Sequence, residues 1–177
     1  MTQHATELQM YVGLKESEKT TTQAANYIED LKSGVASDSQ MLVITSTEKS
    51  TLVNLSDESH TILEEVKANC VALFKGNIYG TITYSNKVCC YKSTGEPLWT
   101  FMHQDINHIG GIALDKNGFV YIVSRGNNSI VVVSPDGKIS KTILSKADGI
   151  NKPCTIDINR ETGMMILSSN IWMILMV

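Results

Sequence analysis

Short runs of apolar residues alternate with turn-forming residues along most of the chain. The clearest unit reads as four strands, at 111–115, 119–124, 129–134 and 139–144. Valine, isoleucine and tyrosine dominate these runs, and such residues fit the half-buried surface of a pleated sheet. Glycine, asparagine and proline fill the connections at 116–118, 125–128 and 134–137. Because turns need a positive or a fixed φ, the pattern predicts antiparallel strands joined by tight turns.

The same unit recurs along the chain. Tyr79 corresponds to Tyr121 and Gly95 to Gly137, so the spacing is 121 − 79 = 137 − 95 = 42 residues. A further copy opens at Pro153, and a fainter, earlier copy holds the runs 41–45 and 50–56 as its middle strands. Four strands in a period of this length are the signature of a propeller blade. The sequence therefore predicts a mainly β chain, a partial β-propeller with about two full four-stranded blades and parts of two more.

The block 111–139, GIALDKNGFVYIVSRGNNSIVVVSPDGKI, resembles an NHL repeat. Such repeats combine a D-x-x-G turn, a V-Y-V strand, a G-N-N loop and a P-D-G turn. The resemblance extends over roughly residues 66–170. The chain departs from it at Ser124, where the repeat usually has an acid, and at Ser129, where it usually has a basic residue. As a whole, the chain resembles the carboxy-terminal part of a tripartite-motif (TRIM) type protein, in which a coiled coil leads into an NHL propeller.

Residues 1–34 are predicted to form one amphipathic helix ahead of the blades. Apolar and small residues recur there at steps of four and three, the spacing of a heptad seam; the seam includes Met10, Leu14, Ala24, Ile28 and Leu31. Two interpretations stay open, the end of a dimerising coiled coil or a helix that packs its apolar stripe on the propeller. Residues 35–66 are predicted as a partial blade with lead-in strands, and 67–177 as NHL-type blades truncated at the carboxy terminus.

Composition and charge limit which partners and which cellular compartment we expect for the chain. The apolar share is 42%, the charged share 19% and the net charge −3, so the chain can bury a core but has no global basic field for nucleic acid. Cys89 and Cys90 are adjacent and would point to opposite faces of a strand. No C-x-x-C pair and no signal-peptide core occur, and the apolar run 171–177 is too short to span a bilayer. We therefore expect a cytoplasmic protein with reduced thiols and no membrane partner.

The sequence lacks the patterns that usually mark catalytic or metal sites. His103 and His108 lie five residues apart without a carboxylate or cysteine at ligand spacing. No nucleophile elbow, phosphate loop or zinc-protease motif occurs. The expectation is a chain with no cofactor, no metal and no catalytic residues. Ubiquitin-ligase activity would need RING and B-box modules, which this chain does not carry.

Binding is the expected function, and the loops between the second and third strands of each unit are the candidate sites. Tyr84 and Asn86 lie in one such loop, and Arg125, Asn127 and Asn128 occupy matched positions in the next. Arginine and tyrosine often anchor interfaces, whereas the asparagines are more readily explained as turn formers.

The resemblance implies a non-catalytic protein-interaction module, the substrate-recognition or scaffold end of a TRIM-like ubiquitin ligase. RNA binding is the alternative, and a propeller hydrolase or lyase ranks third. A protein is the first choice of partner and RNA the second. A homodimer would form through the amino-terminal helix or through exposed edge strands, whose unpaired backbone groups invite pairing.

Overall fold

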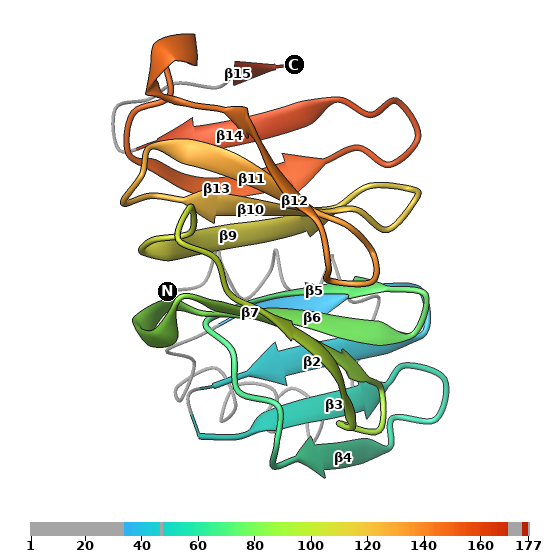
Figure 1. Ribbon diagram of the computed structural model, residues 1–177. Coiled ribbons are helices and arrows are strands. Elements are labelled where there is room, and N and C mark those ends of the chain that lie inside the picture. Colours follow the sequence, from blue (N-terminus) through green and yellow to red (C-terminus); the bar gives the residue numbers. More distant parts are fainter. Residues whose placement is uncertain (1–33, 47, 170–174, 177) are drawn as a thin grey trace, which may run out of the picture. The chain divides into compact units, whose positions relative to one another are not determined.

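The computed structural model describes a β-rich unit in the carboxy-terminal four-fifths of the 177-residue chain (Figure 1). Its described residues are 34–46, 48–169 and 175–176. Residues 1–33 of the predicted helix over 1–34 and most of the run 171–177 lie outside these residues, and Gly34, which is described, is not helical. The proposed seam of Met10, Leu14, Ala24, Ile28 and Leu31 also lies outside the described residues.

Four antiparallel sheets make up this unit. The first sheet contains β1 (Val35–Ser37), β2 (Met41–Thr45), β3 (Ser50–Asn54) and β4 (His60–Leu63). The second contains β5 (Cys70–Phe74), β6 (Asn77–Ile82), β7 (Lys87–Lys92) and β8 (Pro97–Phe101). The third contains β9 (Ile109–Leu114), β10 (Val120–Ser124), β11 (Ser129–Val133) and β12 (Ser140–Leu144). The fourth contains β13 (Pro153–Ile158), β14 (Met165–Ser169) and β15 (Leu175–Met176).

Each sheet is a meander in which strands pair in the order of the sequence, as expected of a propeller blade. The four strands predicted within 111–144 are confirmed, and so are the two middle strands at 41–45 and 50–56. The first blade is more complete than the sequence predicted. Residues 35–66 hold four paired strands instead of part of a blade, because β1 and β4 are too short and too weakly apolar to stand out by pattern.

Neighbouring blades pack face to face through separate apolar cores. Val43 and Ile78 belong to the core between the first two blades, and Val88 and Ile122 to the next. The third core contains Val123 among others. Each inner blade must therefore be apolar on both faces, which explains the nearly continuous apolar runs of β7, β10 and β11.

Cys89 and Cys90 show this two-faced burial within one strand. Both are buried, but Cys89 belongs to the core shared with the first blade and Cys90 to the core shared with the third. The expected alternation of the two thiols is thus confirmed. Burial raises the pKa of Cys90 to about 11 and that of the neighbouring Tyr79 to about 12.

The first strands of successive blades, β1, β5, β9 and β13, lie next to one another. Glycine permits the closest approach: a Cβ atom at Gly110 would lie 2.5 Å from the carbonyl oxygen of Cys154. The ladder between β9 and β10 shifts register between Ile122 and Ser124, opposite this glycine. A register shift of this kind bends a strand, so β9 meets β13 along a kinked, side-chain-free stretch.

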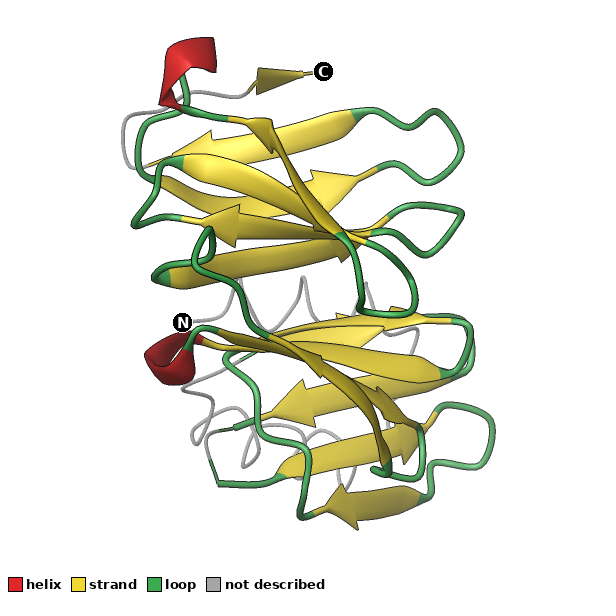
Figure 2. Ribbon diagram, viewed as in Figure 1, coloured by secondary structure: helices red, strands yellow, loops and turns green. Residues whose placement is uncertain are grey.

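The loops between strands form two opposite rims. The loops β2–β3, β4–β5, β6–β7, β8–β9, β10–β11 and β12–β13 form what we call the groove rim, which includes both short 3₁₀ turns (Figure 2). The 3₁₀ turns cover Thr83–Ser85 and Lys146–Asp148. The loops β1–β2, β3–β4, β5–β6, β7–β8, β9–β10, β11–β12 and β13–β14 form the turn rim at the other ends of the strands. All the second-to-third-strand loops singled out by the sequence therefore share one rim.

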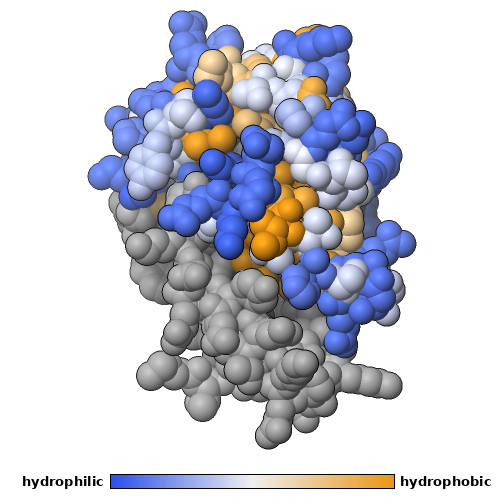
Figure 3. Space-filling view, turned by 90° about the horizontal axis from the view of Figure 1, so that it is seen from below, coloured by the Kyte–Doolittle hydropathy of each residue, from blue (hydrophilic) through white to orange (hydrophobic). Residues whose placement is uncertain are grey.

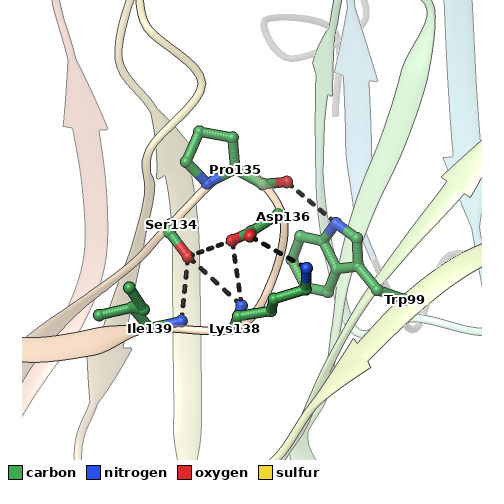
Figure 4. Close-up of polar contacts among 6 residues, drawn as sticks. All are labelled: Trp99, Ser134, Pro135, Asp136, Lys138 and Ile139. Carbon is green, nitrogen blue, oxygen red and sulfur yellow. Dashed lines mark hydrogen bonds and ion pairs between the residues drawn. The ribbon is translucent and has the colours of Figure 1, made fainter.

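On the turn rim, Trp99 joins the second blade to the third (Figure 4). Its Nε1 donates a hydrogen bond to the carbonyl oxygen of Pro135 at 3.1 Å, and its ring meets Tyr79 edge-on at 5.9 Å between centroids. Gly137 leaves room for the indole, since a Cβ there would lie 2.6 Å from the ring. Ser134 closes the turn by donating to the Asp136 carboxylate at 2.6 Å. The proline-containing turn is therefore a docking point between blades.

The first and fourth blades differ in the faces that they turn away from their neighbours. On the first blade, Val35 and Ile62 are 44% and 49% exposed. Figure 3 shows a patch of apolar side chains, bordered by hydrophilic ones, on the face seen from below. On the fourth blade, the corresponding face of β13 and β14 carries Thr155 and Asp157 as well as Ile166. The outward face of the first blade is thus the more apolar of the two.

Candidate functional site

A groove on the groove rim, between the third and fourth blades, brings together several of the loops. Its volume is about 430 Å³, within the usual range for binding sites. The lining residues are Thr83, His108, Ile109, Gly110, Arg125, Gly126, Asn128, Lys152 and Cys154. The loops β6–β7, β8–β9, β10–β11 and β12–β13 therefore meet here, and two of the five predicted site residues, Arg125 and Asn128, line the groove.

The backbone that carries Arg125 is fixed to the preceding loop. The Arg125 N–H donates to the carbonyl oxygen of His108 at 3.2 Å, and the Gly126 N–H donates to that of Asn107 at 2.9 Å. Ser124 adds to this connection, since its Oγ accepts from the Asn107 N–H at 2.9 Å and donates to the Asp105 carbonyl oxygen at 3.0 Å. Ser124 thus takes a structural role at a position where the NHL repeat usually has an acid.

Asn128 has a structural role in the groove, because its side chain already bonds within the chain. Its φ of +51° is a left-handed conformation that asparagine tolerates better than most residues. Its side-chain Oδ1 accepts a hydrogen bond from the Lys152 N–H at 2.7 Å. Asn128 therefore holds the β12–β13 loop beside Arg125, and Lys152 with it.

The other three predicted residues lie on the same rim but do not line the groove. Tyr84 is 91% exposed, next to the lining residue Thr83. Asn86 has a φ of +50° and ends the 3₁₀ turn, with its side-chain oxygen buried and without a partner among the described residues. Asn127 donates from Nδ2 to the Gln104 carbonyl oxygen at 3.4 Å. Tyr84 is thus the one with a side chain fully open to a partner, whereas Asn86 shapes its turn.

His108 and Lys152 line the groove but are not among the five binding residues predicted from the sequence. Each stands immediately before the first strand of a blade, and each has a positive φ, +47° and +45°. They occupy equivalent places in successive repeats, but their spacing is 152 − 108 = 44 residues instead of 42. The longer β12–β13 loop hides the match in a fixed-period alignment. The strand starts observed in the structure, Ile109 and Pro153, bring out the pair, because they too are 153 − 109 = 44 residues apart.

A second hollow of about 540 Å³ lies on the turn rim of the first blade. Its lining residues are Ser39, Gln40, Met41, Leu52, Asn54, Leu55, Ser56, Ser59, Thr61 and Ser93. None of these carries a charge, and some of their polar atoms already serve the turn, as where Asn54 Oδ1 accepts from the Ser56 hydroxyl at 2.8 Å. Although this hollow is larger, the groove beside Arg125 has the side chains that can select a ligand by charge.

The described residues contain no group of three or more histidine, cysteine or acidic side chains placed to hold a metal ion. They also contain no helix long and apolar enough to cross a membrane.

The fold is that of β-propeller proteins. A chain in the crystal structure of a nidogen/laminin complex is similar with a TM-score of 0.66 and 15% identity, over 77% of this chain and 56% of that one. A streptogramin B lyase is similar with a TM-score of 0.63 and 16% identity, over 78% and 48%. A virginiamycin B lyase from Staphylococcus aureus has the same TM-score and coverage with 20% identity. At these identities the likeness concerns the fold alone, and the chain spans about half of each structure.

Similarity in sequence is narrower. No family model matches the chain. The E3 ubiquitin-protein ligase TRIM56 of Mus musculus is 25% identical over 81 residues, which cover 45% of this chain and 11% of that protein. The chain thus combines a propeller-type fold with a limited sequence similarity to a TRIM protein.

Proposed function

We propose that this chain is a non-catalytic protein-interaction module whose partner binds on the groove rim, and that it serves a TRIM-like ubiquitin ligase as a substrate-recognition or scaffold part. The observation that supports this most is the groove itself. It gathers Arg125, Lys152 and His108 from three different loops on a rigid stack of blades. Binding residues are commonly carried by loops on a rigid scaffold.

The relatives support the proposal at a coarse level. The similarity to TRIM56 points toward ubiquitin ligases, and one similar fold comes from a protein complex, that of nidogen with laminin. Tyr84 and Arg125 belong to the two residue types most often found as interface anchors. They stand in equivalent loops of adjacent blades, so one partner surface can reach both.

RNA binding is the alternative function. The cations available for a basic, RNA-binding face are Arg125, Lys87, Lys116 and Lys152. Lys116 lies in the β9–β10 turn, on the turn rim, whereas Arg125 and Lys152 line the groove and Lys87 begins β7 at the groove rim. Three of the four cations therefore share one rim. The groove lining contains no phenylalanine, tyrosine or tryptophan on which bases could stack, however, and this favours a protein partner.

Catalysis is the third possibility, because two of the similar structures are lyases. A propeller enzyme would need an acid–base pair at the ligand. The groove lining contains His108 and Cys154 but no aspartate or glutamate, so none of the lining residues is a carboxylate that could orient the histidine. This favours binding over turnover.

The experiment that tests the proposal is affinity capture from cell extract by the immobilised full chain, with and without RNase. The double variant Arg125→Gln/Lys152→Gln removes both groove cations, and Lys116→Gln is the matched control on the other rim. We expect proteins that wild type and control retain but the double variant loses, with or without RNase. Loss of these proteins on RNase treatment alone would indicate RNA binding, and equal capture by all three chains would contradict the assignment of the groove.

A further inference from the structure

The charges that line the groove all have the same sign. Arg125 and Lys152 are its charged lining residues, and no aspartate or glutamate lines it. Within the described part of the chain, neither cation forms an ion pair with a carboxylate. Both are exposed at the mouth of a concave site. An anionic ligand would therefore meet two cations without having to displace a partner from either.

The acidic residues close in sequence to the groove are already engaged. Asp105 lies 3.4 Å from the His103 ring nitrogen Nδ1. Asp148 accepts hydrogen bonds from the backbone N–H and the hydroxyl of Ser145, at 2.9 and 3.0 Å. These carboxylates stabilise their own loops, so the groove cations remain available to a ligand.

The backbone under both cations is held in place before any ligand arrives. Hydrogen bonds tie Arg125 to the β8–β9 loop and Lys152 to Asn128. A site whose backbone is already ordered loses less entropy on binding. The lining also includes Ile109, whose side chain is buried in the core, and Gly110, which has no side chain. A segment with small residues between its charges can therefore lie close to the backbone at this point.

Size and chemistry favour a peptide over a nucleic acid. Proteins that bind single-stranded RNA usually stack bases on aromatic rings along a basic channel. Here the lining contains no phenylalanine, tyrosine or tryptophan, and Tyr84 stands outside it. A groove of about 430 Å³ takes a few side chains, which matches a short segment.

We infer that the groove between the third and fourth blades binds an acidic peptide segment, with Arg125 and Lys152 pairing with its carboxylates and Tyr84 packing beside it. This inference rests on the proposed function and adds the chemistry of the partner. Arginine pairs with carboxylates in a two-pronged geometry. Arg125 is therefore the main contact, and Lys152 supports it as a point charge.

The test is fluorescence anisotropy of the full chain with three labelled probes. The first is an eight-residue peptide that alternates glutamate with glycine, the second replaces each glutamate by glutamine, and the third is an oligouridylate of equal negative charge. We expect the glutamate peptide to bind at least about tenfold more tightly than the glutamine peptide, and its affinity to fall as salt rises. Equal binding of the two peptides, or tighter binding of the oligouridylate, would overturn the inference.

Variants locate the binding. Arg125→Gln should weaken binding of the glutamate peptide by about tenfold, Lys152→Gln by a smaller factor, and Lys116→Gln not at all. An equal loss in Lys116→Gln would show that the peptide binds the overall charge and not the groove. If the peptides fail to bind while protein capture still depends on Arg125 and Lys152, the acidic chemistry is wrong and the proposed function stands.

Discussion

The two rims of the same blades use their charged side chains in opposite ways. On the turn rim, Arg160 donates from Nη2 to the Leu73 carbonyl oxygen at 2.7 Å and from Nε to that of Leu114 at 3.3 Å, so it joins three blades. On the groove rim, Arg125 and Lys152 bond within the chain through their backbone and leave their side-chain charges at the groove. The difference teaches that the groups a side chain reaches, and not its residue type, separate a structural arginine such as Arg160 from a candidate binding residue such as Arg125.

Trp99→Ala should lower the stability of the chain more than the other variants, because it removes the turn-rim contact between the second and third blades. The indole packs edge-on against Tyr79 and bonds to Pro135. We expect the free energy of unfolding to fall by about 3 kcal/mol, as for other large aromatic truncations. Urea unfolding followed by circular dichroism measures it. Trp99→Phe keeps the ring and should lose only about 1 kcal/mol; equal losses in both variants would mean that the hydrogen bond, and not the packing, holds the turn.

Arg160→Ala should come second. The guanidinium also lies 5.2 Å from the centre of the Phe74 ring, so the variant loses two hydrogen bonds and a cation–π contact. We expect a loss of about 2 kcal/mol in the free energy of unfolding. Arg160→Lys keeps the charge but cannot reach both carbonyl oxygens with one planar group, so it should recover only part of the loss. Full recovery by lysine would show that charge alone matters at this rim.

The core between the rims should respond to pH. Burial raises the pKa of the Cys90 thiol from its ordinary value of 9.0 to about 11. The folded chain therefore holds this proton more tightly, and its contribution to stability is complete below about pH 9 and is lost as pH rises through 11. We expect wild type to lose about 1–2 kcal/mol over this interval in urea unfolding. Cys90→Ala should flatten the slope, and an unchanged slope would contradict the assignment.

Asn128→Ala tests a structural residue on the groove rim. The variant loses the acceptor for the Lys152 N–H and places alanine at a φ of +51°. We expect a loss of about 1 kcal/mol in thermal or urea unfolding. Asn128→Gly keeps the left-handed conformation and should lose less. If glycine and alanine are equally destabilising, the hydrogen bond and not the conformation carries the effect.

Much of the fold could be predicted from the sequence, because period and turn chemistry are local signals. The strands within 111–144 follow from their apolar runs and from the turns that contain Gly118 and Gly137. The outer strands of the first blade were missed, since β1 has three residues and β4 has three exposed residues out of four. Contacts such as Arg160 to Leu73 join residues 87 apart, and no local pattern encodes them.

The sequence predicted only part of the candidate site, because the rest of the site depends on how the blades pack against one another. Arg125 and Tyr84 lie in loops of equal length, so the repeat in the sequence identified both as candidate binding residues. Lys152 and His108 become groove residues only because β9 and β13 approach closely at Gly110. That approach depends on packing between blades, which a single sequence does not show.

Arg125→Gln should have the smallest effect on stability and the largest on binding, which makes it the sharpest test of the comparison between the rims. Its side chain has no ion-pair partner within the described residues, so its removal should change the free energy of unfolding by less than about 0.5 kcal/mol. Glutamine keeps most of the side-chain length, and the backbone bond to His108 is unaffected. Arg160→Gln applies the same change on the turn rim and should instead destabilise the chain. If the two variants lose equal stability, Arg125 is a structural residue, and the distinction between the rims fails at the position on which the proposed groove most depends.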